Sequence, residues 1–212
     1  MNPEQSLDLI ILAADKDAIE ALNGILQTLP LKGRMKRIRY EIKPALMHDG
    51  AARRHAHELL RPYIRQARFA LVVFDREGCG AEGLSRIEIE REVLGRLEEN
   101  GWHGRAEAVV IDPELEAWVW SHSPKVDEVL GWSGCQPPLR EALKVEGWLA
   151  EAGMKPARPR EAMKWALLQS KTPWSASLFS RLAQQVSYVR CTDPAFLKLL
   201  TTLGNWFPAE DA

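Results

Sequence analysis

The stretch Leu71–Gly83, LVVFDREGCGAEG, decides the fold predicted for this chain. It begins with four apolar residues that favour β-structure, and three glycines follow close together. A short uncharged run of this kind, ended by glycine, is typical of a buried strand in a parallel sheet. In open parallel sheets, ligands bind beyond the carboxyl ends of the strands. Asp75 and Glu77 would stand at that edge, on the same side of an extended chain.

Two carboxylates placed in this way could hold one metal ion. The pair also has a purely structural interpretation, in which Asp75 caps a turn and Glu77 is solvated. A lone Asp-x-Glu motif is short, and for such motifs the structural interpretation is the commoner one. The rest of the chain must therefore decide between the two.

Three further segments have the pattern of strands. Residues 7–13, LDLIILA, form a second apolar run, and residues 106–111, AEAVVI, form a third. Apolar and charged residues alternate over residues 35–43, which predicts a half-exposed strand at the edge of a sheet. Together with a strand at 69–74, these segments alternate with helical patterns and predict an α/β fold. The expected architecture is Rossmann-like, with a mostly parallel four-stranded sheet and helices on both of its faces.

The helices between the strands are predicted from apolar residues at helical spacing and from capping residues. One helix is expected from residue 49 to about residue 66, with a kink or break at Pro62. Another, at residues 86–100, follows Ser85, which has a glutamate three residues later as in a capping box.

After Asp112 the pattern changes from alternating strands and helices to helices alone. Five helical segments are expected, separated by links that contain proline or glycine: 113–122, 139–152, 160–170, 175–186 and 194–205. The chain is therefore predicted to have two parts, an α/β domain at residues 1–122 and a helical subdomain at residues 123–212.

The composition is that of an ordinary globular protein. The chain has 212 residues and a formal net charge of −1, which suits one domain with an appendage or two small domains. No apolar run is long enough to span a membrane, and the first residues lack the layout of a secretory signal. Three widely spaced cysteines form neither a C-x-x-C pair nor a disulfide framework, so we expect a cytoplasmic protein. A P-loop for nucleotide hydrolysis is absent.

Acidic residues follow three of the predicted strands. They are Asp15 and Asp17 after the first strand, Asp75 and Glu77 after the third, and Asp112, Glu114 and Glu116 after the fourth. Because parallel strands share one carboxyl edge, these acids are expected to meet there. Like charges at such short range repel each other unless a cation is present. Mg²⁺ or Mn²⁺ takes oxygen ligands of this kind.

Each acid also has a local interpretation. Asp112 is a good helix N-cap before Pro113, and Glu114 suits the positive end of that helix's dipole. Glu116 could simply face solvent. The acids after the first strand could cap the first helix, whereas those after the third are explained least, because no helix follows them directly.

Residues 32–68 are strongly basic within a nearly neutral chain, with eleven Lys and Arg against three Asp and Glu. Basic patches bind the phosphate backbone of nucleic acids. The residues expected to make these contacts are Arg37, Arg39, Arg53 and Arg54. A solvated edge strand and an exposed helix face would carry similar charges without binding anything.

The layout resembles the Toprim domain of topoisomerases, primases and OLD-type nucleases. Residues 11–22, ILAADKDAIEAL, resemble its first motif, and Asp17 fits the later aspartate of that motif. The stretch VVFDREGCG, residues 72–80, resembles its Asp-x-Asp motif in the form Asp-x-Glu. Residues 111–120, IDPELEAWVW, resemble a helix start in prokaryotic Toprim-like proteins that are often associated with ATPases in defence and mobile loci. The resemblance covers about residues 7–120.

The resemblance implies a Mg²⁺-dependent nuclease, or another hydrolase that processes phosphodiesters of nucleic acid, with a role in anti-phage defence. Asp75 and Glu77 would hold Mg²⁺ or Mn²⁺, with Asp17 and Asp112 as further ligands. Catalysis would depend on Asp75, Glu77 and Glu116, and the basic region would hold the nucleic-acid backbone.

This sequence departs from the Toprim pattern at one position. The glutamate that ends the first Toprim strand, often the general base, should fall near Ala13 or Ala14. Asp15 or Glu116 could substitute for it. Without a substitute, the resemblance favours a catalytically degenerate binding or sensor subunit that partners an ATPase. A small-molecule phosphohydrolase that uses the same acids is a third alternative.

Overall fold

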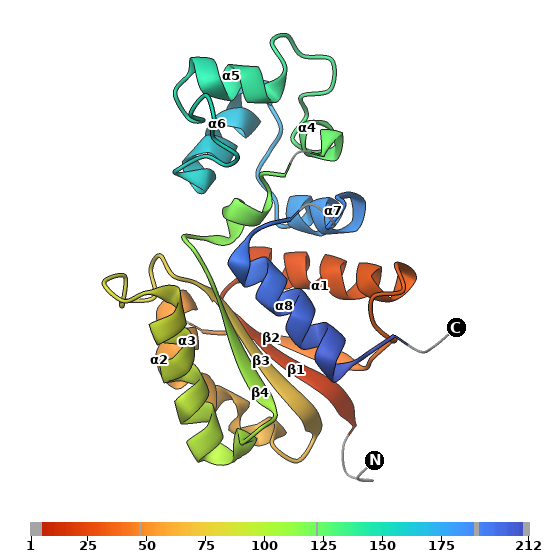
Figure 1. Ribbon diagram of the computed structural model, residues 1–212, viewed down its shortest axis with the longest axis vertical. Coiled ribbons are helices and arrows are strands. Elements are labelled where there is room, and N and C mark those ends of the chain that lie inside the picture. Colours follow the sequence, from red (N-terminus) through yellow and green to blue (C-terminus); the bar gives the residue numbers. More distant parts are fainter. Residues whose placement is uncertain (1–5, 47, 122, 189–190, 210–212) are drawn as a thin grey trace.

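A four-stranded parallel sheet forms the centre of the computed structural model, which describes residues 6–46, 48–121, 123–188 and 191–209. The strands are β1 (Leu7–Ala13), β2 (Tyr40–Pro44), β3 (Ala67–Asp75) and β4 (Ala106–Ile111). Their order in the sheet is β2-β1-β3-β4, and every neighbouring pair is parallel. Helices cover both faces of this sheet (Figure 1). The predicted α/β class and parallel sheet are therefore confirmed.

Three helices connect the strands and cover opposite faces of the sheet. They are α1 (Lys16–Leu31), α2 (His48–Leu60) and α3 (Arg86–Leu97). Leu9 and Ile11 of β1 pack in one core with α1, whereas Ile10 and Leu12 pack in a second core with α2 and α3. Both faces of β1 are thus buried, which explains why this strand is an uninterrupted apolar run in the sequence.

Local signals predict the break at Pro62 and the start of α3 correctly, although α2 ends before residue 66, where its end was predicted. Helix α2 ends at Leu60, and a 3₁₀ turn at Arg61–Tyr63 follows, in agreement with the break expected at Pro62. Helix α3 begins with a complete capping box, in which Ser85 N donates to Glu88 Oε2 at 2.8 Å and Ser85 Oγ accepts from the backbone of Glu88.

The edge strand is shorter than the predicted segment 35–43, although its place at the edge is confirmed. Leu9 of β1 pairs with Tyr40, so the residues before Tyr40 have almost no length of β1 beside them. Met35 is instead buried in the core, and Arg39 N donates to Asp8 Oδ2 at 2.8 Å. Alternation of polar and apolar residues here reflects half-burial of the chain rather than strand pairing.

The second half of the chain adds five α-helices among its described residues. They are α4 (Pro124–Val129), α5 (Leu139–Val145), α6 (Pro159–Ser170), α7 (Ser177–Gln185) and α8 (Pro194–Trp206). Helix α4 was not predicted, although Ser123 caps it and Pro124 follows at its first position. Helix α5 ends at Val145 instead of residue 152, and Gly147 follows with a φ of 76°.

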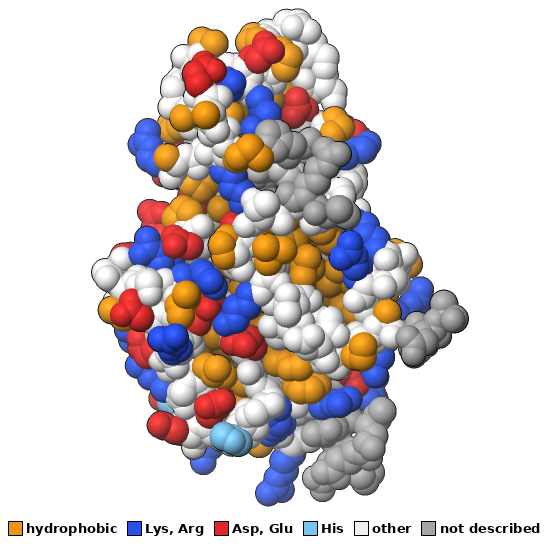
Figure 2. All heavy atoms as spheres, in the orientation of Figure 1, with side chains coloured by type: hydrophobic (Ala, Val, Ile, Leu, Met, Phe, Trp, Pro, Cys, Tyr) orange, Lys and Arg blue, Asp and Glu red, His pale blue; other side chains and the backbone are white. Residues whose placement is uncertain are grey.

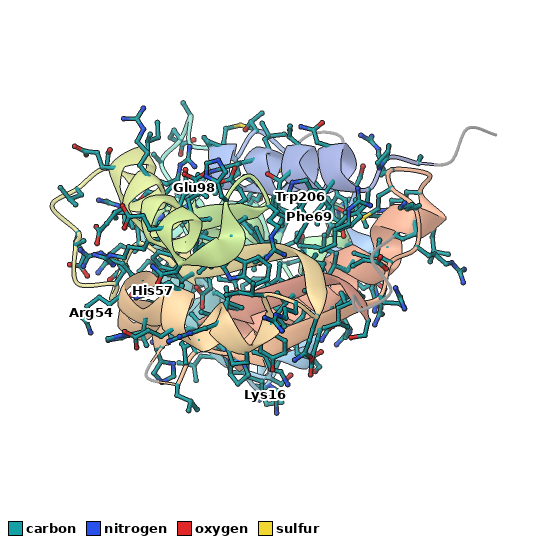
Figure 3. The ribbon with its side chains drawn as sticks, turned by 90° about the horizontal axis from the view of Figure 1, so that it is seen from below. Lys16, Arg54, His57, Phe69, Glu98 and Trp206 are labelled. Atoms are coloured by element: carbon teal, nitrogen blue, oxygen red, sulfur yellow. The ribbon has the colours of Figure 1, made fainter. Side chains whose placement is uncertain are left out.

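The second-half helices occupy two places relative to the sheet. Helices α4, α5 and α6 group beyond the carboxyl ends of the strands, whereas α7 packs along α1 and α8 along β4 (Figure 1). Figure 3 shows Trp206 of α8 beside Phe69 of β3, and their rings stack with centroids 4.6 Å apart. The core on this face therefore combines side chains from both halves of the chain.

Side chains from two helices cover the open edge of β4. Glu90 of α3 is 5% exposed and accepts a hydrogen bond from Val110 N at 3.1 Å. Lys198 of α8 donates to Ala108 O at 2.8 Å and also pairs with Glu90. Backbone groups that an edge strand would leave free are thus satisfied within the chain, which prevents pairing with another strand.

The helix predicted at residues 113–122 is wrong. The chain forms only a 3₁₀ turn at Leu115–Trp118, and the last residue of the predicted helix lies outside the described residues. Glu114 and Glu116 both contact Arg160 of α6. Residues two apart point to different sides of an α-helix. An α-helical segment would therefore not bring both carboxylates to one guanidinium group.

None of the described helices has the length and apolar character needed to cross a membrane.

Candidate functional site

The candidate site lies where the order of strands changes direction. From β1 the chain moves to β2 on one side, and it then returns to β3 on the other side of β1. The carboxyl ends of β1 and β3 are neighbours, because Ala13 pairs with Val73. Open α/β sheets bind ligands at such a switch point. Asp15 directly follows Ala14 beyond β1, and Asp75 is the last residue of β3.

Asp75 is a buried carboxylate at the centre of this edge. Its backbone N–H donates to Asp49 Oδ1 at 2.8 Å, which fixes the end of β3 against the start of α2. Burial raises the pKa of Asp75 well above its usual value, and the neighbouring charges of Asp49 and Glu116 raise it further. A hydrogen bond from the backbone of Leu115 and the charge of Arg160 oppose this shift.

Arg160 is the cation around which the acids converge. Its Nη2 lies 3.4 Å from Asp75 Oδ2, and its Nε lies 3.1 Å from Glu116 Oε1 and 3.2 Å from Glu114 Oε2. Burial alone would lower the pKa of Arg160, but the charges of these acids raise it, so the guanidinium stays charged. Three carboxylates thus share one positive charge, and the cluster carries excess negative charge when all three are ionised.

Glu114 joins the helical half of the chain to the sheet edge. Besides its ion pair with Arg160, its Oε1 accepts a hydrogen bond from Arg160 N at 2.8 Å, at the beginning of α6. A carboxylate at this position satisfies a free helix N–H and interacts well with the helix dipole. Burial raises the pKa of Glu114. The first turn of α6 is thereby fixed over the acid cluster.

Glu116 has one oxygen that is not satisfied. The residue is 1% exposed, and its Oε1 contacts Arg160, whereas its buried Oε2 has no hydrogen-bond partner among the described residues. Burial raises the pKa of Glu116, and the charge of Arg160 opposes this shift. A buried carboxylate oxygen without a partner is costly. Such an oxygen is a natural ligand for a cation.

Acids from the ends of β1 and β2 complete the cluster. Asp15 caps α1 by accepting a hydrogen bond from Ala18 N at 2.8 Å, which confirms the capping role considered from the sequence. Asp17 accepts from Trp174 Nε1 at 2.9 Å, and burial raises its pKa. Asp49, at the beginning of α2, is close enough to Asp15 and Asp75 for their charges to interact. Acidic residues therefore lie at the carboxyl ends of all four strands.

Two of the predicted metal ligands lie outside the buried cluster. Glu77 is exposed, because the chain turns after β3 and Glu77 N donates to Pro113 O at 3.0 Å. Its charge is still close enough to raise the pKa of Glu114. Asp112 is also exposed and pairs with Arg76 at 2.9 Å. The helix-capping role considered for Asp112 is wrong, since Asp112 pairs with an arginine side chain and no α-helix follows it.

The donor set at this edge is compatible with a divalent cation held by two protein ligands. Within the described ranges, no group of three or more His, Cys, Asp or Glu side chains forms a ready-made metal site. Mg²⁺, however, is commonly held by one or two carboxylates, with water and substrate phosphates as its other ligands. Asp75 and Glu116 supply such a pair, and the unpartnered Oε2 of Glu116 fits this role.

The four arginines predicted to bind nucleic acid lie in two separate places. Arg37 and Arg39 precede β2, so they lie near the amino edge of the sheet, away from the acid cluster. Arg53 and Arg54 are on α2, and Figure 3 shows Arg54 on the outer side of that helix. Arg53 is engaged with Glu92 at 3.1 Å and Gly80 O at 3.0 Å.

The surface seen in Figure 2 is also mixed, with basic and acidic side chains interspersed over the face that it presents. Of the four arginines, Arg54 combines exposure with a position near the glycine-rich loop after β3. It is therefore the best placed of the four to contact a ligand at the carboxyl edge.

Sequence reasoning missed two members of the cluster, Asp49 and Arg160. Asp49 was treated only as the start of a helix, and Arg160 is 85 positions from Asp75 in the chain. The sequence did carry one signal for Arg160. An arginine in the first turn of a helix opposes the helix dipole, so its position there indicates that an acid lies nearby.

Comparison of the chain with protein-family models, curated proteins and solved structures found no match.

Proposed function

We propose that this chain is a Toprim-like, Mg²⁺-dependent protein that processes phosphodiester bonds of nucleic acid, as a nuclease or a related hydrolase in prokaryotic defence. The observation that carries the proposal is the convergence of Asp75 and Glu116 at the switch point of a parallel sheet. Both are buried, and together with Glu114 they share a single guanidinium. The arrangement has excess negative charge when all three acids are ionised, and Glu116 has an unpartnered carboxylate oxygen; both features favour a divalent cation.

Each residue of the site has a proposed role. Asp75 and Glu116 hold the cation, and Asp49 fixes Asp75 through the backbone N–H of that residue. Arg160 can bind a phosphate, since guanidinium groups match phosphate oxygens in geometry and charge. Glu77 is exposed at the same edge and can accept a proton from water. Bound Mg²⁺ would supply an activated water and neutralise charge on the phosphate.

The proposal is tested by incubating the purified chain with plasmid DNA, single-stranded DNA and single-stranded RNA. Cleavage of at least one of these is expected with Mg²⁺ or Mn²⁺. It should stop when EDTA is added and resume when the metal is restored in excess. If cleavage persists in EDTA after the protein has been stripped of metal, the metal-dependent mechanism is wrong.

A second candidate function is a catalytically degenerate binding or sensor subunit that partners an ATPase. The observation in its favour is Ala14, which is buried at the end of β1 near the position of the missing Toprim glutamate. Its side chain can neither ligate a metal nor take a proton. On this alternative the chain binds Mn²⁺ and nucleic acid but cleaves neither DNA nor RNA, and it purifies from its native source together with an ATPase.

A further inference from the structure

Arg160 holds the acid cluster in a way that a divalent cation would disturb. Its Nε is shared by Glu114 and Glu116, at 3.2 and 3.1 Å, and its Nη2 makes a longer contact of 3.4 Å with Asp75. A cation bound to Asp75 and Glu116 would neutralise the charges that attract the guanidinium. It would also repel the guanidinium directly, because both are positive and close together.

The contact with Glu114 has a different character from the other two. Glu114 also accepts a hydrogen bond from Arg160 N, so its carboxylate stays beside the first turn of α6 wherever the arginine side chain points. Glu114 can therefore retain Arg160 when Asp75 and Glu116 no longer do. The guanidinium would turn about this anchor rather than leave the site.

Arg160 is also the most accessible member of this group. Its side chain is 37% exposed, whereas those of Asp75, Glu114 and Glu116 are at most 9% exposed. Part of the Arg160 side chain thus faces solvent, whereas the acids that it contacts are enclosed. Arginine presents its donors in a planar fork that pairs well with two oxygens of a phosphate.

We propose that Arg160 is the phosphate-binding residue of the site and that it exchanges partners. Without metal it pairs with Asp75 and Glu116, and a divalent cation displaces it from them so that it can bind a phosphate of the substrate. Metal and phosphate therefore bind in a coupled way, with the cation first. This inference rests on the proposed function, because it requires the cation to bind Asp75 and Glu116.

The test compares Arg160→Gln with the unaltered chain in a titration with Mn²⁺ alone, followed through the electron paramagnetic resonance signal of free Mn²⁺. Glutamine removes the positive charge that competes with Mn²⁺ for the acids, and its backbone N–H can still donate a hydrogen bond to Glu114. Mn²⁺ should therefore bind about tenfold more tightly to the variant. In the presence of Mn²⁺, its affinity for a single-stranded oligonucleotide should fall by about tenfold. Arg160→Lys keeps the charge without the fork, so its Mn²⁺ affinity should return to that of the unaltered chain, and it should recover only part of the oligonucleotide affinity.

Arg76→Gln is the matched control, because the side chain of Arg76 pairs with exposed Asp112 and with the backbone oxygens of Glu82 and Leu84 at the same edge. Its Mn²⁺ affinity should match that of the unaltered chain. Equal or weaker Mn²⁺ binding by Arg160→Gln would overturn the exchange of partners and leave the proposed metal site standing. If none of the chains binds Mn²⁺, the proposed function fails as well. Circular dichroism shows whether Arg160→Gln folds. If it does not, the test depends on Arg160→Lys, and the inference is overturned if this variant binds the oligonucleotide as tightly as the unaltered chain does.

Discussion

Asp75→Asn is expected to abolish metal-dependent cleavage while the chain stays folded. Asparagine keeps the size of the side chain but removes the negative charge that would bind the cation. Loss of residues that only support a metal ligand costs about 10- to 100-fold in affinity or activity, so loss of a ligand should cost about 100-fold or more. Cleavage rates measured at saturating Mg²⁺ check this expectation.

The fold should tolerate this change, because the position of Asp75 is fixed through its backbone. Asp49 accepts a hydrogen bond from Asp75 N, and the variant retains that bond. The change also removes a buried charge that repels Asp49 and Glu116. In metal-free buffer, the melting temperature of Asp75→Asn should therefore equal or exceed that of the unaltered chain.

The pH dependence of the free energy of unfolding gives a further prediction for Asp75→Asn. Because the pKa of Asp75 is raised in the folded state, the folded chain binds this proton more tightly than the unfolded chain does. Without metal, the contribution of Asp75 to stability therefore falls as the pH rises above the usual pKa of aspartate. Asp75→Asn should therefore lose less stability than the unaltered chain as the pH rises from about 4.

The matched control is Asp112→Asn, which alters an exposed acid at the same edge that pairs with Arg76. Its cleavage rate should stay within about twofold of the unaltered chain, since surface ion pairs contribute little. Cleavage by Asp75→Asn at the rate of the control would remove Asp75 from the site. A simultaneous loss of activity and of folded structure would make its role structural.

Glu90→Ala is expected to have the largest effect on stability. Glu90 is 5% exposed and accepts from Val110 N, from Arg86 Nη1 at 2.5 Å and from Lys198 Nζ at 3.1 Å. Alanine would leave a backbone donor and two partly buried cations without this partner. Breaking a buried ion pair costs about 3–5 kcal/mol. Because both cations are partly exposed, we expect the free energy of unfolding to fall by about 3 kcal/mol. Urea unfolding followed by circular dichroism measures it.

Glu90→Gln separates the charge from the hydrogen bond. Glutamine can still accept a hydrogen bond from Val110 N, so this backbone group at the edge of β4 stays satisfied. The loss of stability should therefore be clearly smaller than with alanine. Because α8 is attached to β4 partly through Lys198, the alanine variant should also expose the edge of β4 and aggregate more readily. Equal unfolding free energies for Glu90→Ala and the unaltered chain would contradict this view of the edge.

The strands were predictable where the sequence carries strong and uninterrupted patterns. The bounds of β1 and β4 agree with the expected segments 7–13 and 106–111, because buried parallel strands are apolar on both faces. The segment 35–43 was extended too far toward the amino end, since alternation does not reveal where β1 begins. The segment 113–122 was predicted as a helix, but a tertiary contact with Arg160 sets its conformation.

The site was predictable in part for the same reason. Asp75 at the end of β3 and Glu114 and Glu116 after β4 reach one guanidinium, because parallel strands bring their carboxyl ends to one edge. Arg160 comes from a helix in the other half of the chain, and its distance from Asp75 in the sequence hides the contact. Glu77 follows a turn whose direction depends on a contact with Pro113, so its exposure could not be read from the Asp-x-Glu spacing. The identity of the cation and the reaction stay predictions.

In the proposed site, Asp75 and Glu116 together hold a divalent cation at the carboxyl edge of the sheet. An anomalous difference map from crystals of the unaltered chain soaked in Mn²⁺ tests it most directly. We expect a peak within coordination distance of both carboxylates, with Arg160 turned away from Asp75. Mn²⁺ bound only elsewhere, with Arg160 still in contact with Asp75 and Glu116, would rule out this site.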